Sequence, residues 1–284
     1  MTNATALQSG KGHTDENFPV ASFLIAPQHR APVLAFYRFA RFADDIADNA
    51  EASVEDKLQL LENMRATLAG ESDVSQESLK LRHICLEKNL STQHGLDLLE
   101  AFRRDVTKLR YADWHDLMDY CRYSAMPVGR FVLDVHGESR KTWPANDALC
   151  AALQVINHLQ DCAKDYRSLN RVYLPEDKLA AAGITVEDLG EPQSSPALLG
   201  VIRKVAERTN ELLWESAKFS SQIRDARLAL EVAIIQRLAE DLTKRLLSRD
   251  PLKDNVHHSK AQAGILALTC LPRYALSRLK GRAS

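Results

Sequence analysis

Two pairs of aspartates repeat the same spacing in distant parts of the sequence. Asp44 and Asp48 are four residues apart, and so are Asp161 and Asp165. In a helix this spacing places both carboxylates on one face, about 6 Å apart at Cβ, where their like charges repel. Hard oxygen ligands of this kind favour Mg²⁺, which bridges protein carboxylates to substrate phosphates. The repeated spacing predicts a magnesium–diphosphate site, formed where two such helices pack face to face.

Polar residues beside these pairs extend the predicted site. Arg41 precedes Asp44 by three residues and can hold either carboxylates or phosphate oxygens. Asn157 lies one helical turn before Asp161, and Gln154 lies a further turn back. The chemistry of such a set is the neutralisation of a diphosphate and its stabilisation as a leaving group.

A single pair of this kind carries little weight, because solvated helix faces often carry acids at this spacing. Here both pairs lie in otherwise apolar helices, and the second is surrounded by Leu153, Val155, Ile156 and Leu159. Charged groups in apolar surroundings are seldom without a function. The duplication therefore favours a functional site over a solvated surface.

The rest of the sequence predicts helices. The 284 residues include only 11 Gly and 10 Pro, which leaves little turn chemistry for an all-β fold. Apolar residues recur at helical spacing through nearly every long segment. We expect an all-α fold with helices over about 30–48, 53–69, 77–89, 91–109, 117–136, 147–170, 196–223, 225–249 and 259–279.

Composition narrows the class of protein. Hydrophobic residues make up 45% and charged residues 26%, the mixture of a soluble globular chain. A formal net charge of −1 argues against a nucleic-acid binder, which normally shows a basic excess. The five cysteines are scattered without C-x-x-C spacing, as expected of reduced thiols in a cytoplasmic protein. Residues 1–17 are polar and predict a flexible N-terminal arm, and no linker divides residues 18–284, for which we expect a single domain.

The sequence resembles the squalene/phytoene synthase family, the all-trans head-to-head prenyl synthases. The first aspartate-rich motif of that family is similar to Tyr37-x-Phe39-x-Arg41-x-x-Asp44-Asp45-Ile-x-Asp48. The second is similar to Gln154-x-x-Asn157-x-x-Gln160-Asp161-x-x-x-Asp165, followed by Arg171-Val-Tyr173-Leu-Pro. The resemblance covers roughly residues 18–271 and implies a single-domain, isoprenoid-synthase-like helical bundle with a central active-site cavity.

The resemblance also implies a role for each matching residue. The four aspartates would bind Mg²⁺ and diphosphate, with Arg41, Gln154 and Asn157 as catalytic partners. Tyr120, which begins Tyr-Cys-Arg-Tyr-Ser, would line the reaction cavity as a further catalytic residue. The expected substrate-binding residues are Tyr37, Phe39, Ser124, Gln160, Arg171 and Tyr173.

Two segments resemble one branch of the family, the bacterial hydroxysqualene synthases of hopanoid biosynthesis. These segments are residues 16–22 (ENFPVAS) and 123–129 (YSAMPVG). Many relatives carry basic residues where this chain has Thr14-Asp15-Glu16, so expected phosphate ligands are missing. This departure fits one diphosphate-bearing substrate, presqualene diphosphate, better than the condensation of two prenyl diphosphates.

The activity implied for this branch is that of a Mg²⁺-dependent carbon–oxygen lyase. Diphosphate leaves presqualene diphosphate, and the rearranged cation captures water to give hydroxysqualene. No G-x-G-x-x-G follows a strand, so we expect no nicotinamide cofactor. Tyr120, Tyr123, Ser124 and Asn157 are candidates to position the water, and Pro127 would free a backbone carbonyl near Tyr123. The implied pathway partner is a downstream squalene-forming oxidoreductase.

Several alternatives stay open. The enzyme alternative is a presqualene diphosphate or phytoene synthase, and the non-enzyme alternative is a helical scaffold that kept the fold. The apolar segment 263–271 is expected either to pack as a final core helix or to touch the inner face of a membrane. His257 and His258 receive no role from sequence alone, and the role of Lys260 stays open.

Overall fold

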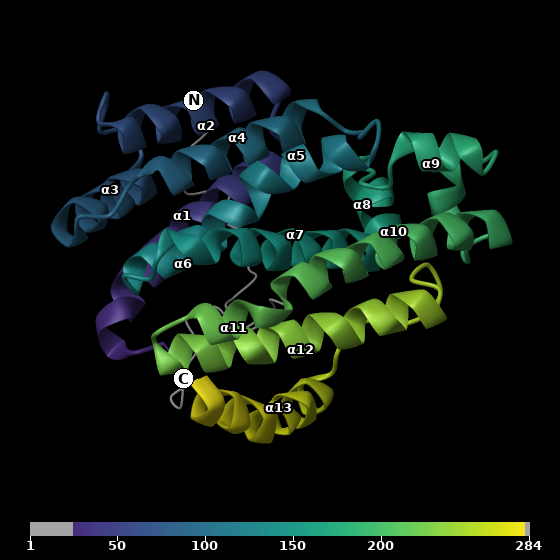
Figure 1. Cartoon of the computed structure of the whole chain (residues 1–284). Coiled ribbons are helices and arrows are strands. Elements are labelled where there is room, and N and C mark those ends of the chain that lie inside the picture. Colours follow the sequence, from purple (N-terminus) through teal and green to yellow (C-terminus); the bar gives the residue numbers. More distant parts are fainter. Residues whose placement is uncertain (1–24, 282–284) are drawn as a thin grey trace. The chain divides into compact units, whose positions relative to one another are not determined.

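The structure, a computed structural model, describes residues 25–281, apart from the side chains of residues 272, 273 and 275–281. Every regular element in this range is a helix, which confirms the all-α prediction (Figure 1). No disulfide joins the five cysteines. The predicted arm, residues 1–17, lies outside the described residues.

Nine long helices correspond to the predicted pattern: α1 (Pro27–Asp48), α2 (Val54–Ala69), α3 (Gln76–Lys88), α4 (Gln93–Thr107), α5 (Trp114–Ser124), α7 (Trp143–Gln160), α10 (Pro196–Glu215), α12 (Ala226–Ser248) and α13 (Lys260–Gly281). Shorter ones connect them: α6 (Met126–Val135), η2 (Arg140–Thr142), α8 (Cys162–Leu169), α9 (Glu176–Ala181), η3 (Val186–Gly190), η4 (Ser216–Lys218) and α11 (Phe219–Gln222). None of the helices within residues 25–281 has the length and apolarity of a membrane span.

Local capping explains several helix ends. The Ser53 hydroxyl accepts a hydrogen bond from the Asp56 amide and begins α2, which Gly70 ends in the left-handed conformation at φ 87°. Asp113 caps α5 by accepting from the Asp116 amide. These signals depend on residues within one turn of each other, so they are visible in the sequence.

Three predicted helices are interrupted. The segment 117–136 divides at Ala125, where Pro127 cannot donate to the Tyr123 carbonyl. The segment 147–170 starts four residues early, at Trp143, and breaks at Asp161, whose backbone leaves helical values at φ −102° and ψ 8°. The segment 196–223 ends as a helix at Glu215, and a 3₁₀ turn follows.

The break after Glu215 has a tertiary cause. The buried Ser216 hydroxyl lies 3.2 Å from the Leu213 carbonyl, and the Gln236 amide donates to the same carbonyl at 2.9 Å. Ser216 also bonds to the Gln236 side-chain oxygen at 2.8 Å. Side chains that engage backbone groups compete with the helical ladder and bend it. Gln236 comes from α12, so the sequence around Ser216 carries no sign of the break.

The described chain divides into two compact units. The first unit comprises the residues up to Leu109 together with Pro127–Gly137, and the second comprises Arg110–Met126 together with the residues from Glu138 onward. The first aspartate pair lies in the first unit and the second pair lies in the second. A single domain over residues 18–284, with a central cavity, stays a prediction.

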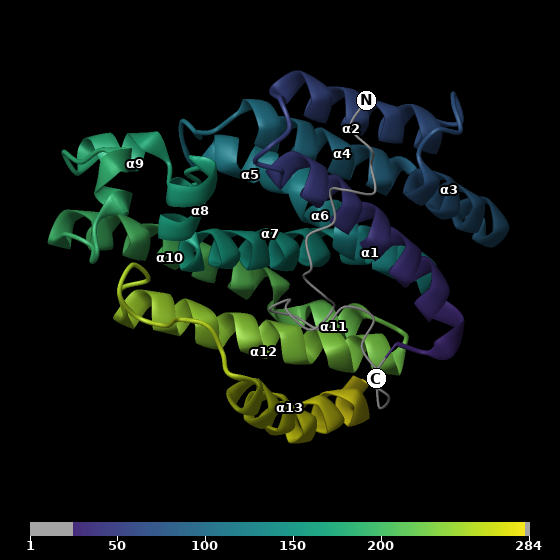
Figure 2. The same cartoon turned by 180° about the vertical axis from the view of Figure 1, so that it is seen from behind.

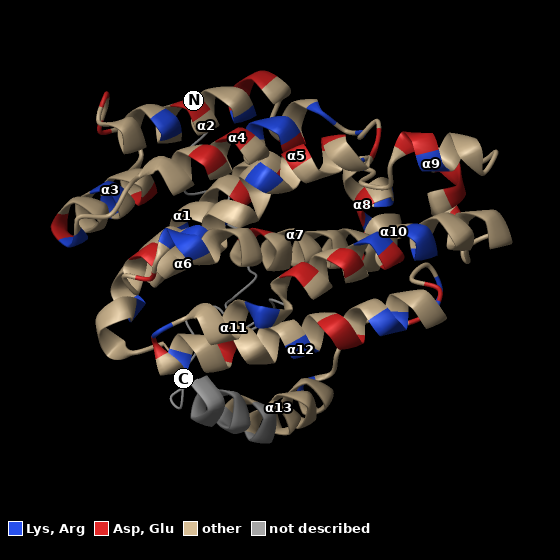
Figure 3. Cartoon of the chain, in the orientation of Figure 1, with Lys and Arg blue, Asp and Glu red and all other residues tan. Residues whose placement is uncertain are grey.

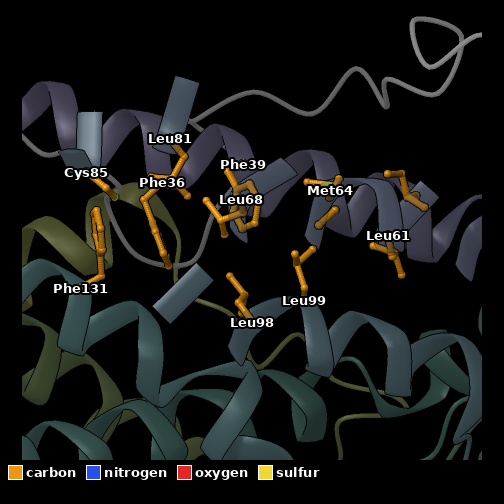
Figure 4. Packing of buried hydrophobic residues seen from close by; sticks show 12 residues of the cluster. Phe36, Phe39, Leu61, Met64, Leu68, Leu81, Cys85, Leu98, Leu99 and Phe131 are labelled. Atoms are coloured by element: carbon orange, nitrogen blue, oxygen red, sulfur yellow. The ribbon is translucent and has the colours of Figure 1, made fainter. Parts of the chain in front are cut away.

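The first unit is built on the apolar faces of α1 to α4 and α6. Twelve buried side chains form its core, and Figure 4 shows them between these helices. Phe36 of α1 stacks on Phe131 of α6 with ring centroids 4.2 Å apart. Phe39 is fully buried in the same cluster. The core side of α1 thus anchors the helix that carries Asp44 and Asp48.

The second unit is a layered set of helices around α7. Helix α10 packs on both α7 and α12, α5 packs on α7, and α13 packs on α12 (Figures 1 and 2). The segment Arg171–Pro175 is buried and forms the connection that the sequence predicted between α8 and α9. Helix α7 therefore lies at the centre of the unit that contains the second aspartate pair.

Two helical glycines make a matched test of core packing. A Cβ at Gly95 would lie 2.7 Å from Leu68 Cδ2 and 3.3 Å from Phe39 Cε1, whereas a Cβ at Gly200 would meet nothing within 4 Å. Gly95→Ala should lower the free energy of unfolding by about 1–3 kcal/mol, because the core around it cannot take another methyl group.

Gly200→Ala should raise the free energy of unfolding by up to about 1 kcal/mol through helix propensity alone. Urea titrations followed by circular dichroism measure both values. Equal effects of the two substitutions would contradict the close approach at Gly95.

Candidate active site

In the first motif, one arginine serves two neighbouring aspartates. Arg41 Nη1 lies 2.7 Å from Asp44 Oδ2, and Arg41 Nη2 lies 2.8 Å from Asp45 Oδ1. The Asp45 side chain is buried, with 6% of its surface exposed, whereas that of Asp44 keeps 36% exposed. Asp45 is thus the structural partner of Arg41, and Asp44 is the carboxylate open to a ligand.

Asp44 lies in an excess of negative charge. Burial raises the pKa of its carboxyl to about 7, and the negative charge of Asp48 adds to the rise, while Arg41 opposes it. Asp105 and Asp45 raise the pKa further. Several carboxylates lie close together here, and their mutual repulsion opposes the ionisation of Asp44. A divalent cation bound to these oxygens would remove that repulsion. The residues present therefore fit a cation at this position.

Asp105 is a member of this cluster that the sequence analysis missed. It lies on α4, is 7% exposed, and acts electrostatically on Asp44. Its position follows Leu98 and Ala101 along the buried face of α4. An acid on an apolar stripe was the criterion that singled out Asp161, and the same criterion applied to α4 would have found Asp105.

The other predicted residues of α1 differ in exposure. Tyr37 lies one turn before Arg41 and is partly buried. Phe39 is fully buried, 6.4 Å from the Phe36 ring, among the core side chains of the first unit. Packing accounts for Phe39 in this structure, and its role in substrate binding stays a prediction.

The second motif keeps its one-turn spacing across the helix break. The Asp165 backbone amide donates to the Asp161 carbonyl at 2.8 Å. The Asp161 backbone amide donates to the Asn157 carbonyl at 3.0 Å. Asp161 lies at the N-terminus of α8, where the helix dipole favours a negative charge. Asn157, Asp161 and Asp165 thus follow one another at single turns, as the spacing predicts.

Asp161 has a partner to which the sequence analysis assigned no role. His257 Nε2 lies 3.6 Å from Asp161 Oδ1. Burial opposes ionisation of Asp161, but the hydrogen bond from His257 and the charge of Lys164 hold the pKa of the carboxyl below its ordinary value. The first aspartate of this motif is therefore ionised where Asp44 is partly protonated.

His257 also borders a polar pocket. A cavity of about 300 Å³ is lined entirely by polar and basic residues: Arg245, Arg249, Asn255, His257, His258, Ser259 and Gln262. His258 is tied to Asp241 at 2.9 Å, and Arg245 is tied to the same carboxylate at 2.8 Å. Such a lining is suited to anions. Lys260 is exposed and does not belong to it.

An aromatic cluster accompanies the second motif. The ring of Tyr173 stacks on that of His158 at 3.4 Å, with Tyr120 at 5.5 Å and Tyr111 at 5.4 Å from Tyr173. Burial lowers the pKa of His158 to about 3, so its ring is neutral. The ring nitrogen Nε2 therefore accepts the hydrogen bond from the Gln154 amide at 3.1 Å. Gln154, Tyr120 and Tyr173, which were predicted as site residues, are brought together.

Gln160, Arg171 and Ser124 complete the predicted set. The buried Gln160 amide donates to the Val256 carbonyl at 3.4 Å, which ties α7 to the segment carrying His257. Arg171 is 7% exposed, and its charge lowers the pKa of His158 further. The Ser124 hydroxyl is buried and has no hydrogen-bond partner within residues 25–281. Among the residues that the structure describes, that hydroxyl is thus an unsatisfied buried polar group.

Comparison with known proteins covers the part of the chain that contains both motifs. The family profile described as squalene/phytoene synthase matches residues 11–262. The chain is 59% identical over 262 residues to a hydroxysqualene synthase of Zymomonas mobilis, covering 92% of this chain and 88% of that protein. It is 56% identical to a hydroxysqualene synthase of Rhodopseudomonas palustris, covering 90% and 88%. The crystal structure of a squalene synthase from Alicyclobacillus acidocaldarius superposes with a TM-score of 0.70 at 32% identity, covering 80% of this chain and 86% of that one.

The adjacent residues Asp44 and Asp45 should respond oppositely to neutralisation. In metal-free protein the raised pKa of Asp44 means that the free energy of unfolding falls as the pH rises from about 4 to about 7, because over this range the unfolded chain releases the proton that the folded chain still holds. Asp44→Asn should therefore raise the free energy of unfolding at pH 8, by about 1 kcal/mol after allowance for partial exposure. The gain should shrink as the pH falls towards 5.

Asp45→Asn removes the buried partner of Arg41 and should lower the free energy of unfolding by about 1–3 kcal/mol. Thermal melts of both variants in a chelating buffer measure the contrast. A destabilised Asp44→Asn protein at pH 8 would show that Asp44 is a structural residue.

Proposed function

Because the chain belongs to the squalene/phytoene synthase family, we propose that it is a hydroxysqualene synthase that converts presqualene diphosphate and water into hydroxysqualene and diphosphate. The observation that carries the proposal is the 59% identity, over 92% of this chain, to a protein of that name. Both aspartate pairs that the reaction would need are intact. A scaffold would gain nothing from the charge repulsion at Asp44.

The four aspartates would hold Mg²⁺, which supplies charge neutralisation to the diphosphate as it leaves. Arg41 orients Asp44, the first member of the first pair, through their ion pair, and buried Asp45 holds Arg41 in place. His257 helps to hold the pKa of Asp161 below its ordinary value, so this carboxylate is ionised near neutral pH and would be available to a cation. When the carbon–oxygen bond breaks, its electron pair leaves with the diphosphate and a carbocation remains.

The aromatic cluster is suited to the cation. The π faces of Tyr120 and Tyr173 attract positive charge without offering a nucleophile. Neutral His158, packed on Tyr173, adds no competing positive charge. These rings would stabilise the cation while it rearranges.

Water capture is assigned to Ser124. Its hydroxyl lies one turn after Tyr120 on α5, is buried, and has no partner in the described part of the chain. This hydroxyl would supply one of the polar partners that an ordered water needs. The water oxygen forms the new carbon–oxygen bond, and its proton passes to the departed diphosphate.

One observation favours a second candidate, the condensation of two prenyl diphosphates to presqualene diphosphate or phytoene. The basic pocket beside His257 could take a second diphosphate group.

In the favoured function the product is an allylic-type alcohol, whose conversion to squalene would require a separate reductive enzyme. A nicotinamide cofactor is needed by neither candidate.

Incubation with presqualene diphosphate and Mg²⁺ should give hydroxysqualene without NADPH, and oxygen from labelled water should appear in the alcohol. Farnesyl diphosphate alone should give little product. Gas chromatography with mass spectrometry identifies the products. Efficient conversion of farnesyl diphosphate to presqualene diphosphate as the end product would favour condensation instead.

Asp161→Asn should reduce turnover in this assay by at least about two to three orders of magnitude, since it removes part of the stabilisation of the leaving diphosphate. Asp177→Asn, at an exposed aspartate of α9, is the matched control and should retain full activity. Unchanged helicity by circular dichroism excludes unfolding as the cause.

Ser124→Ala should change the product rather than abolish ionisation. Without the hydroxyl, less water is held near the cation, so proton loss to a hydrocarbon should increase at the expense of hydroxysqualene. Ser124→Thr keeps a hydroxyl and should restore the alcohol. An unchanged ratio of alcohol to hydrocarbon in Ser124→Ala would remove Ser124 from the mechanism.

A further inference from the structure

Helix α13 has one packed face and one open face. Cys270 is 7% exposed and lies with its sulfur 3.8 Å from the Ala233 carbonyl of α12, and the Tyr274 hydroxyl donates to the Ala226 carbonyl at 2.6 Å. Ile265, Leu268 and Leu271 remain 64%, 66% and 43% exposed. Their spacing of three residues places them along one side of the helix, away from Cys270. The sequence left two roles open for this segment, packing against the core and contact with a membrane. The packed face accounts for the first, and only the open face is available for the second.

The exposed side chains of α13 form a ridge rather than isolated positions. Single exposed apolar residues are ordinary on a protein surface. Within residues 25–281, other large apolar side chains of similar exposure, such as Leu86 and Trp214, lie far apart along the chain, whereas α13 presents three within seven residues. A contiguous apolar ridge of this kind indicates a surface that is covered by a membrane or by another protein molecule.

The charge around the ridge indicates what covers it. Residues 255–284 contain five Lys and Arg and no Asp or Glu, although the whole chain has a net charge of −1. The described part of α13 accordingly carries no acidic residue in Figure 3. Exposed Lys260 lies at the start of the helix, and Arg273, Arg278, Lys280 and Arg282 follow the ridge in sequence. An apolar ridge flanked by basic residues is the pattern of helices that lie in the interface of an anionic bilayer.

We propose that α13 binds the surface of an anionic lipid bilayer, with Ile265, Leu268 and Leu271 inserted at the level of the headgroups. A second copy of the chain is a poorer occupant, because pairing two α13 helices would bring two strongly basic segments together. The packed face keeps the helix attached to α12 while the ridge is in the lipid. The inference depends on α13 alone and stands apart from the proposed reaction.

Sedimentation of the full-length protein with vesicles tests this proposal. We expect binding to vesicles of phosphatidylcholine mixed with phosphatidylglycerol and little binding to phosphatidylcholine alone. Raising the salt concentration from about 0.1 M to about 0.5 M should weaken the binding, since it screens the basic residues. Equal binding to both kinds of vesicle, or to neither, would overturn the proposal.

Paired variants assign the binding to the ridge. The double substitution Ile265→Gln and Leu268→Gln should lower the vesicle partition coefficient by at least about tenfold. Leu86→Gln, at a position of α3 that is 72% exposed, removes a comparable side chain elsewhere and should leave it unchanged. Melting temperatures of both variants check the fold.

Light scattering after size-exclusion chromatography distinguishes self-association. A wild-type dimer that the double substitution converts to a monomer would show that a second copy covers the ridge, and would overturn the lipid proposal. A monomeric wild type whose vesicle binding depends on the ridge would support it.

Discussion

The arrangement around the first motif depends on holding like charges together at the edge of a hydrophobic core. Asp44 and Asp48 share one face of α1, and Asp105 of α4 adds a third carboxylate close enough to raise the pKa of Asp44. Repulsion of this kind destabilises an isolated helix. It persists here because the opposite side of α1 is anchored by Phe36, Phe39 and their core partners, and because Arg41 neutralises Asp45. Core packing thus supports a cluster of like charges that by itself lowers the stability of the fold.

The first aspartates of the two motifs lie in opposite electrostatic environments, one of which raises the pKa of the carboxyl and the other lowers it. In the first, Asp44 shares Arg41 with Asp45, and burial and the charge of Asp48 raise the pKa of its carboxyl to about 7. In the second, His257 and Lys164 hold Asp161 ionised. A cation binding at the first motif must displace a proton, whereas at Asp161 it meets an ionised carboxylate. The first motif should therefore be the more sensitive of the two to pH.

The product of the proposed reaction and the lipids of the proposed membrane contact are both strongly apolar. A long isoprenoid alcohol is insoluble in water, so an enzyme that releases one benefits from a nearby lipid phase. The surface of α13 and the aromatic cluster lie in the same compact unit, on different helices. Each can be removed by substitution without touching the other.

The sequence by itself determined the helices, and it predicted which aspartates bind a metal. Helical periodicity, the Ser53 and Asp113 caps and the four-residue spacing of the aspartates all act within one or two turns, so they can be read directly from the chain. The same holds for the family motifs, which predicted the fold class and the family; the helical structure and the comparisons confirm both. These features need no knowledge of which helices are neighbours.

Only the tertiary structure decided the environments of these residues. The break at Ser216 requires Gln236 from another helix, the charge excess at Asp44 requires Asp105 from α4, and the low pKa of Asp161 requires His257 from beyond α12. The division of α13 into a packed and an open face depends equally on where α12 lies. Desolvation and charge–charge interaction act through space rather than along the chain, so they become known only when the helices have been placed.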